Sequence, residues 1–125
     1  MLGQTKNEDG AAAVEMALVL PILLLLVFGI IEFGLVFNRY ISVTHAAREG
    51  VRHLALGVDP AEAELKAEGA TGDIVSSDVS DAINCTASEP TTDDVQMLCE
   101  TNYKLNLYVI NSTISLSSTA QMRRE

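Results

Sequence analysis

Tryptophan is absent from this 125-residue sequence, and aromatic residues make up only 5% of it. Aromatic side chains supply much of the buried area in most small cores, so any core here must depend on aliphatic and small residues. Basic residues are also scarce, with 8 Lys and Arg against 17 Asp and Glu and a formal net charge of −9. Because phosphate binding requires a basic face, this balance excludes a nucleic-acid partner.

Known catalytic and metal-binding motifs are missing as well. The sequence contains no G-x-S-x-G, no H-E-x-x-H and no phosphate-binding glycine loop. Its only histidines, His45 and His53, have no accompanying cluster of thiols and carboxylates that would form a zinc site. The aspartates of the acidic segment between Asp59 and Glu100 do not follow the alternating spacing of a calcium loop. We therefore predict no enzyme activity, no cofactor and no metal site.

Cysteine is limited to Cys85 and Cys99. They are too far apart in the sequence for C-x-x-C redox chemistry. Outside the cytoplasm, a disulfide between them would stabilise a small domain by about 3 kcal/mol. The alternative is a pair of buried, unpaired thiols. We expect the disulfide, provided that this part of the chain lies in an oxidising compartment.

One long hydrophobic run is present: Met16–Ile31 consists entirely of apolar and small residues. A transmembrane helix needs about 20 apolar residues, and residues 11–37 carry only two charges, Glu15 and Glu32. A cleaved secretory signal would have a shorter core followed by a small-x-small site, but bulky residues follow here. An ordinary signal anchor fits the length and leaves Glu15 unexplained. The third interpretation is a prepilin-type signal, which is cut before the apolar run.

The positions of the two carboxylates favour the third interpretation. A carboxylate at the bilayer centre costs about 2.5–3.5 kcal/mol, so Glu15 and Glu32 are expected near the membrane edges or beside a cation. A cut after Gly10 would create a positive α-amino group on Ala11, four residues before Glu15. Opposite charges at this i,i+4 spacing meet on a helix, and the same carboxylate could reach a neighbouring subunit's amine. Pro21 removes one backbone hydrogen bond and predicts a kink in this helix.

The segment GAAAVEM (residues 10–16) resembles a prepilin processing site, with Gly before the cut and Glu at the fifth mature position. The continuation ALVLPILLLLVFGIIEFG, the segment HAAREGVRHLA and the C-terminal SLSSTAQMRRE are similar to the TadE-like family of the tight-adherence (Tad, or Flp) pilus system. The resemblance implies a minor pilin or pseudopilin, cut by a membrane prepilin peptidase and assembled with other pilins and pseudopilins as a hetero-oligomer. By position, it makes Gly10 and Ala11 the processing site and Glu15 the processing and assembly glutamate.

Two features of the sequence indicate opposite orientations of the helix in the membrane. Cytoplasmic flanks are normally rich in Lys and Arg, yet the leader MLGQTKNEDG holds a single Lys, and Arg39, Arg48 and Arg52 follow the run. Charge alone therefore favours a cytoplasmic C-terminal part. The resemblance and the cysteines favour the opposite orientation. We predict a single-pass protein of the bacterial inner membrane, with a cytoplasmic N-terminus and an extracytoplasmic C-terminal head, whether or not it enters a surface pilus.

The remaining sequence predicts the rest of an α+β fold. Apolar residues continue at spacings of three and four, which extends the helix to about Ala55 as an amphipathic stalk; they are Phe33, Val36, Phe37, Tyr40, Thr44, Ala47, Val51 and Leu54. Asp59 and Pro60 predict a capped short helix ending near Glu68. Period-two alternation from Val95 to Val109 predicts a strand, Asn111-Ser112 a turn, and the residues from Ile114 a second strand.

The expected architecture is a long N-terminal transmembrane and stalk helix, followed by a small head with a short helix and an antiparallel β-hairpin or small sheet. The predicted boundaries are a leader at 1–10, a transmembrane segment at 11–37, a stalk at 38–56 and a head at 57–125. Three functions remain open. The first is a minor pilin or pseudopilin taking part in assembly of a Tad-type pilus, and the second is a single-pass membrane protein whose acidic head binds a partner without entering a fibre. Processing at Gly10 distinguishes these two. The third is a regulatory subunit of another secretion machine that uses pseudopilins, which only the motif matches separate from the Tad system.

Overall fold

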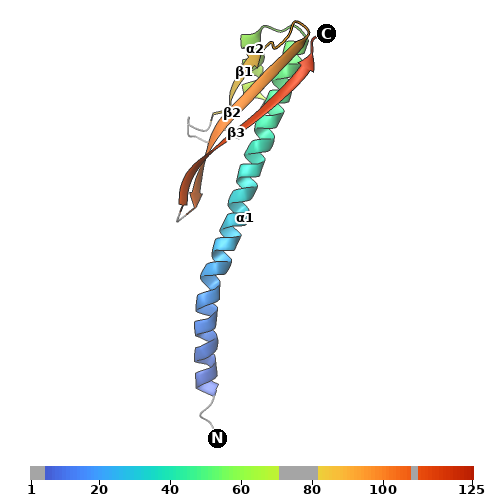
Figure 1. Ribbon diagram of the computed structural model, residues 1–125. Helices are drawn as coiled ribbons and strands as arrows, with labels where there is room; N and C mark the ends of the chain where they lie inside the picture. The colour runs from blue at the N-terminus through green and yellow to red at the C-terminus, as the bar shows by residue number, and fades with distance from the viewer. Residues whose placement is uncertain (1–4, 71–81, 108–109) are drawn as a thin grey trace. The chain divides into compact units, whose positions relative to one another are not determined.

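The computed structural model describes residues 5–70, 82–107 and 110–125. In chain order they form helices α1 (Thr5–Ala55) and α2 (Pro60–Gly69) and strands β1 (Asn84–Ser88), β2 (Asp94–Leu107) and β3 (Ile110–Arg123) (Figure 1). The predicted α+β class is confirmed. The chain divides into two compact units, Met1–Gly34 and Leu35–Glu125.

The first unit is the N-terminal part of α1. The helix begins at Thr5, so six residues of the predicted leader, 1–10, are helical in the uncut chain. Its large apolar side chains, from Val14 to Phe33, are 42–71% exposed. The most apolar stretch has a mean hydropathy of 2.8, and none of it is buried within the protein. By length and composition this helix can cross a membrane. The helix continues through Pro21, where the kink stays a prediction.

The second unit packs around the C-terminal part of α1. The buried α1 side chains are mostly small: Val43, Ala46, Ala47, Val51, Leu54 and Ala55. The predicted apolar face is right for Ala47, Val51 and Leu54, but Phe37 and Tyr40 are 54% and 44% exposed. An apolar pattern repeating every 3.5 residues drifts by about 20° per heptad around a straight helix, so its earlier members leave the face that carries Leu54. Arg39 is only 8% exposed, although it is charged.

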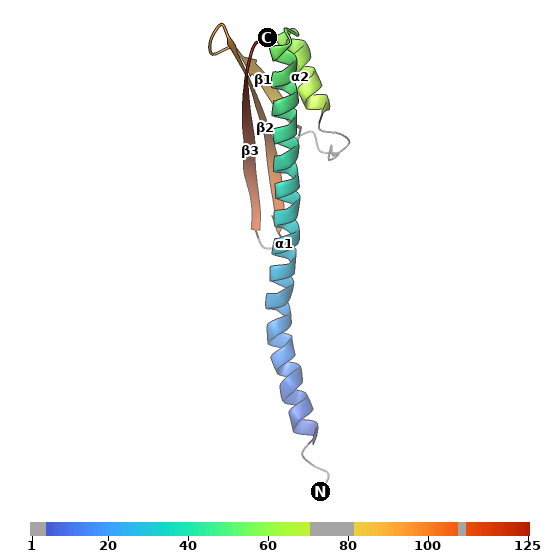
Figure 2. The same cartoon turned by 90° about the vertical axis from the view of Figure 1, so that its right-hand side faces the viewer.

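The two helices and the sheet lie close together at Gly50. A Cβ atom at this position would lie 2.7 Å from Met97 Cε of β2 and 2.8 Å from Ala67 Cβ of α2. Such distances leave no room for any side chain. The small residues of α1 therefore allow its backbone to lie against both neighbours at once, and α2 runs beside α1 in Figure 2.

The connection between α1 and α2 is built as predicted. Gly57, with a φ of 78°, donates its N–H to Leu54 O at 3.0 Å, and Val58 donates to His53 O at 3.1 Å. This pair of bonds is a Schellman motif, which ends the helix at a left-handed glycine. Asp59 Oδ1 then accepts the Ala61 N–H at 3.0 Å, as an N-cap does.

The strands form one antiparallel sheet in the order β1-β2-β3. The predicted period-two face of β2 is confirmed, since Val95, Met97, Cys99 and Thr101 are all buried. The predicted turn at Asn111-Ser112 is wrong, because these residues lie in β3 opposite Asn106 and Leu105. The hairpin reverses between Leu107 and Ile110, and Val109, predicted to lie in the first strand, falls outside the described residues.

The predicted disulfide is present and joins Cys85 to Cys99. The two residues face each other directly across β1 and β2, with Cα atoms 4.1 Å apart. Both side chains are buried, at 6% and 0% exposure. We expected Cys85 to tie a loop onto the sheet; it lies instead in a five-residue strand that the sequence did not predict.

Candidate processing and assembly segment

The predicted processing residues lie on the exposed surface of α1. Gly10, Ala11 and Glu15 are all exposed, and a Cβ atom at Gly10 would meet nothing within 4 Å. Ala11 and Glu15 are four residues apart in a continuous helix, so they lie on the same side of it. In the uncut chain the nitrogen of Ala11 is a neutral peptide amide. Only after a cut at Gly10 would it carry the charge that Glu15 needs.

Glu15 also lines a shallow open depression on the helix surface. The other lining residues are Ala12, Met16 and Val19, which follow the three- and four-residue spacing of one helix face. The small side chain of Ala12 leaves room beside the carboxylate. A side chain or an N-terminus from another molecule therefore has access to Glu15 from this side.

The second carboxylate, Glu32, is partly buried, in contrast to Glu15. The seventeen residues between the two positions correspond to about 25 Å of helix at 1.5 Å per residue. This separation is close to the thickness of the hydrocarbon core, about 30 Å. In a helix that crosses a bilayer, this separation would place the two acidic groups near opposite edges, where the cost of charge is smallest.

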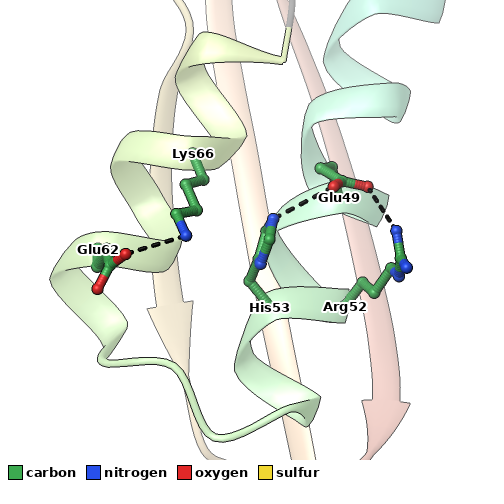
Figure 3. A network of polar contacts seen from close by, with 5 residues as sticks. All are labelled: Glu49, Arg52, His53, Glu62 and Lys66. Carbon is green, nitrogen blue, oxygen red and sulfur yellow. Dashed lines mark ion pairs between the residues drawn. The ribbon is translucent and has the colours of Figure 1, made fainter.

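Polar groups of the second unit gather along α1. Glu49 lies 3.2 Å from His53 Nε2 and 3.8 Å from Arg52, and on α2 Glu62 lies 3.0 Å from Lys66 (Figure 3). These contacts join residues three or four apart on one helix, and they are largely exposed. Sequence reasoning took both histidines as exposed helix residues; the structure makes His53 half-buried beside Glu49.

A groove of ≈ 530 Å³ lies between α1 and the end of β3. It is lined from α1 by His45, Arg48, Glu49, Val51 and Arg52, and from β3 by Thr119, Ala120, Gln121 and Met122. This groove was not predicted from the sequence, because it depends on how a distant strand packs beside the helix. Within residues 5–70, 82–107 and 110–125, no group of three His, Cys, Asp or Glu side chains is arranged to hold a metal.

Two glutamates of α2 cover the outer edge of β1. The Ala87 N–H donates to Glu64 Oε1 at 2.8 Å, and the Cys85 N–H donates to Glu68 Oε1 at 3.3 Å. Four helical residues advance about 6 Å, and two strand residues advance about 6.6 Å, so the two spacings match. The i,i+4 glutamates were visible in the sequence, but β1 itself was not predicted.

Comparison of the sequence with models of known families identifies the family of the N-terminal segment. Residues 10–52 match the model of the family described as TadE-like protein. The chain is TadE-like over this segment. The resemblance predicted from the sequence is thereby confirmed there, and it connects the chain with the Tad pilus system. Neither the curated proteins nor the solved structures gave a match.

The TadE-like segment begins at Gly10, the residue before the predicted cut, and ends at Arg52, an exposed residue of the second unit. It therefore contains Gly10, Ala11, Glu15, Pro21 and Glu32, together with the α1 face that carries Gly50. The sheet and α2 lie outside it. The matched part of the chain lies entirely within α1, and the rest must be interpreted from its own residues.

Proposed function

We propose that this TadE-like protein is a minor pilin or pseudopilin subunit that takes part in assembling a Tad-type surface pilus. One observation carries the proposal: the family match starts at Gly10, and Glu15 follows it at the head of an exposed apolar helix. A soluble globular protein would bury such a helix. An exposed one needs lipid or the helices of neighbouring subunits around it.

Processing supplies the charge on which assembly depends in this proposal. A membrane prepilin peptidase hydrolyses the peptide bond between Gly10 and Ala11, adding water to give a carboxylate on Gly10 and an amine on Ala11. At neutral pH the amine is protonated, since an α-amino group has a pKa of about 7.7–8.0. The new cation lies within reach of Glu15 of the same helix or of a neighbouring subunit.

Pairing with this amine offsets the cost of keeping Glu15 in an apolar environment. An unpaired carboxylate at mid-membrane costs about 2.5–3.5 kcal/mol, so a helix lattice that contains Glu15 is favoured only when the counter-charge is present. Uncut subunits lack it. Cleavage thus selects the mature subunit for assembly, with prepilin peptidase and the other pilins and pseudopilins of the system as partners.

We assign the N-terminus to the cytoplasmic side of the bacterial inner membrane and the second unit to the outside. The disulfide between Cys85 and Cys99 supports this orientation, because disulfides persist in oxidising compartments and are rare in the cytoplasm. A soluble second unit of this size gains from such a cross-link. Its described core contains no aromatic side chain, and the whole chain contains no tryptophan.

The test is the N-terminal residue of the protein purified from cells that contain an active prepilin peptidase, determined by terminal sequencing and intact mass. We expect Ala11. Gly10→Val should block the cut, while Ala13→Val serves as a matched control that changes the same helix and leaves the cut intact. Because a Cβ atom at Gly10 would meet nothing within 4 Å, we do not expect this substitution to disturb the fold, and the helical content of the variant verifies this.

A chain that still begins at Met1 under these conditions would contradict the proposal. It would favour a single-pass membrane protein whose acidic domain binds a partner outside any fibre. Glu15→Gln gives a second test, since it keeps size and hydrogen bonding but removes the charge. We expect normal membrane insertion and cleavage with loss of pilus assembly, scored by electron microscopy of surface fibres.

A further inference from the structure

The two edges of the sheet differ in whether their outward backbone groups have hydrogen-bond partners. On β1, the outward N–H groups of Cys85 and Ala87 are occupied by Glu68 and Glu64. On the opposite side, β3 is the last strand of the described sheet, and it is 14 residues long. An edge strand presents a row of backbone donors and acceptors that can pair with another chain.

The ladder alternation identifies which groups of β3 face outward. Because the Cys85 N–H points away from β2, Cys85 and Cys99 form a non-hydrogen-bonded pair, and Cys99 pairs through its backbone with Ser118 on its other side. The N–H and C=O groups of the alternate residues therefore point away from the sheet. These residues are Thr113, Ser115, Ser117, Thr119 and Gln121.

Among the described residues, β3 lacks three of the usual protections of an edge strand. Proteins commonly close an exposed edge with proline, a bulge or lysine side chains. β3 contains no proline and no lysine, and its pairing with β2 is continuous from Arg123 to Ile110 without an extra residue. The residues whose backbone groups point away from the sheet all have neutral, polar side chains. Such an edge is suited to receive a strand.

The groove beside this edge indicates which kind of strand fits. His45, Arg48 and Arg52 of α1 line it together with Thr119 and Gln121 of β3. Arg52 has Glu49 at 3.8 Å, but among the residues that the structure describes none forms an ion pair with Arg48. In a chain of net charge −9, basic side chains beside an open edge favour an acidic partner.

We propose that β3 accepts an extended acidic segment of another protein, which adds a fourth strand and places carboxylates beside Arg48 and Arg52. This is β-strand addition, in which the main chain gives affinity and side chains give specificity. The edge strands of a second copy do not fit this role. Its β3 contains no acidic residue, and its β1 edge is covered by Glu64 and Glu68.

The experiment uses the full chain in lipid nanodiscs and a short fluorescent peptide that alternates valine with aspartate. A matched peptide with lysine in place of aspartate is the control. We expect fluorescence anisotropy to show binding of the acidic peptide, weakening as salt is added, and none of the basic one. Binding of both peptides alike would overturn the proposed selectivity, and binding of neither would overturn the site.

Two pairs of variants test the two halves of the proposal. Thr119→Pro removes one outward N–H and should weaken binding about tenfold, while Thr119→Val keeps that N–H and should not. Arg48→Glu should weaken binding about fivefold. Lys104→Glu makes the same charge change on the hairpin, away from the groove, and is the matched control that should not weaken binding. An intact disulfide and unchanged thermal unfolding verify the fold of each variant.

If the Thr119→Pro variant binds the acidic peptide as tightly as the unaltered chain does, pairing along β3 is excluded. If two copies associate in one nanodisc and Thr119→Pro abolishes this association, the β3 edge joins copies of this chain instead. Neither result depends on the cut at Gly10, so the proposal can fail while the proposed function stands, and the reverse.

Discussion

The two ends of α1 belong to one continuous helix, but they use it in opposite ways. From Val14 to Phe33 the helix exposes large aliphatic and aromatic side chains, none of them buried. From Val43 to Ala55 it buries small side chains and a glycine against a sheet and a second helix. A single helix can thus be built for lipid at one end and for close packing at the other, and residue size distinguishes the two uses better than apolarity does.

The largest expected difference between the two ends comes from adding a side chain to a glycine. Gly50→Leu should destabilise the second unit by about 4 kcal/mol or more, because its Cβ alone would overlap with Met97 and Ala67. Gly34→Leu is the matched control, since a Cβ there meets nothing within 4 Å. Thermal unfolding followed by near-ultraviolet circular dichroism suits this test, because all three tyrosines follow Leu35 in the sequence. Equal melting temperatures for the two variants would contradict the packing at Gly50.

Shortening a leucine side chain to alanine compares the same two ends of α1 by removing atoms instead of adding them. Leu54 is 1% exposed and Leu23 is 56% exposed. Leu54→Ala should lower the free energy of unfolding of the second unit by about 3 kcal/mol, as buried leucines do. Leu23→Ala should leave that free energy unchanged. The measurement is denaturant unfolding of each full-length variant in micelles, and a similar loss in both would mean that Leu23 is also packed within the protein.

The smallest predicted effect concerns the covered edge of the sheet. Glu64→Ala should destabilise the second unit by about 1–2 kcal/mol, since the Ala87 N–H loses its acceptor. Glu62→Ala removes only the exposed ion pair with Lys66 and should cost less than about 0.5 kcal/mol. Hydrogen exchange at the Ala87 amide sharpens the result: it should accelerate in Glu64→Ala and stay slow in Glu62→Ala.

Local patterns in the sequence were sufficient for most of the secondary structure. The end of α1 near Ala55, the Asp59 cap and the period-two face of β2 each depend on neighbouring residues, and each was predicted correctly. The disulfide was also expected. The candidate processing site is equally local, because Gly10, Ala11 and Glu15 lie within a few residues of one another.

The features that the sequence did not reveal depend on contacts between distant segments. β1 is only five residues long and mostly polar, and it is held by Cys99 and by glutamates of α2 rather than by its own pattern. Asn111 and Ser112 favour turns by themselves, yet pairing with β2 keeps them in a strand. The groove beside β3 is likewise invisible until β3 is placed next to α1.

The C-terminal bonds of the second unit have a mechanical consequence. The Glu125 N–H donates to Ala55 O at 3.2 Å, the Arg124 N–H donates to Asp93 O at 2.7 Å, and the Arg124 side chain pairs with Glu89. A pulling force on this end would meet these few contacts first and would then peel β3 from β2 one residue pair at a time. β1 would stay attached, because a covalent bond between Cys85 and Cys99 holds it. Under tension, the second unit would therefore unravel from β3.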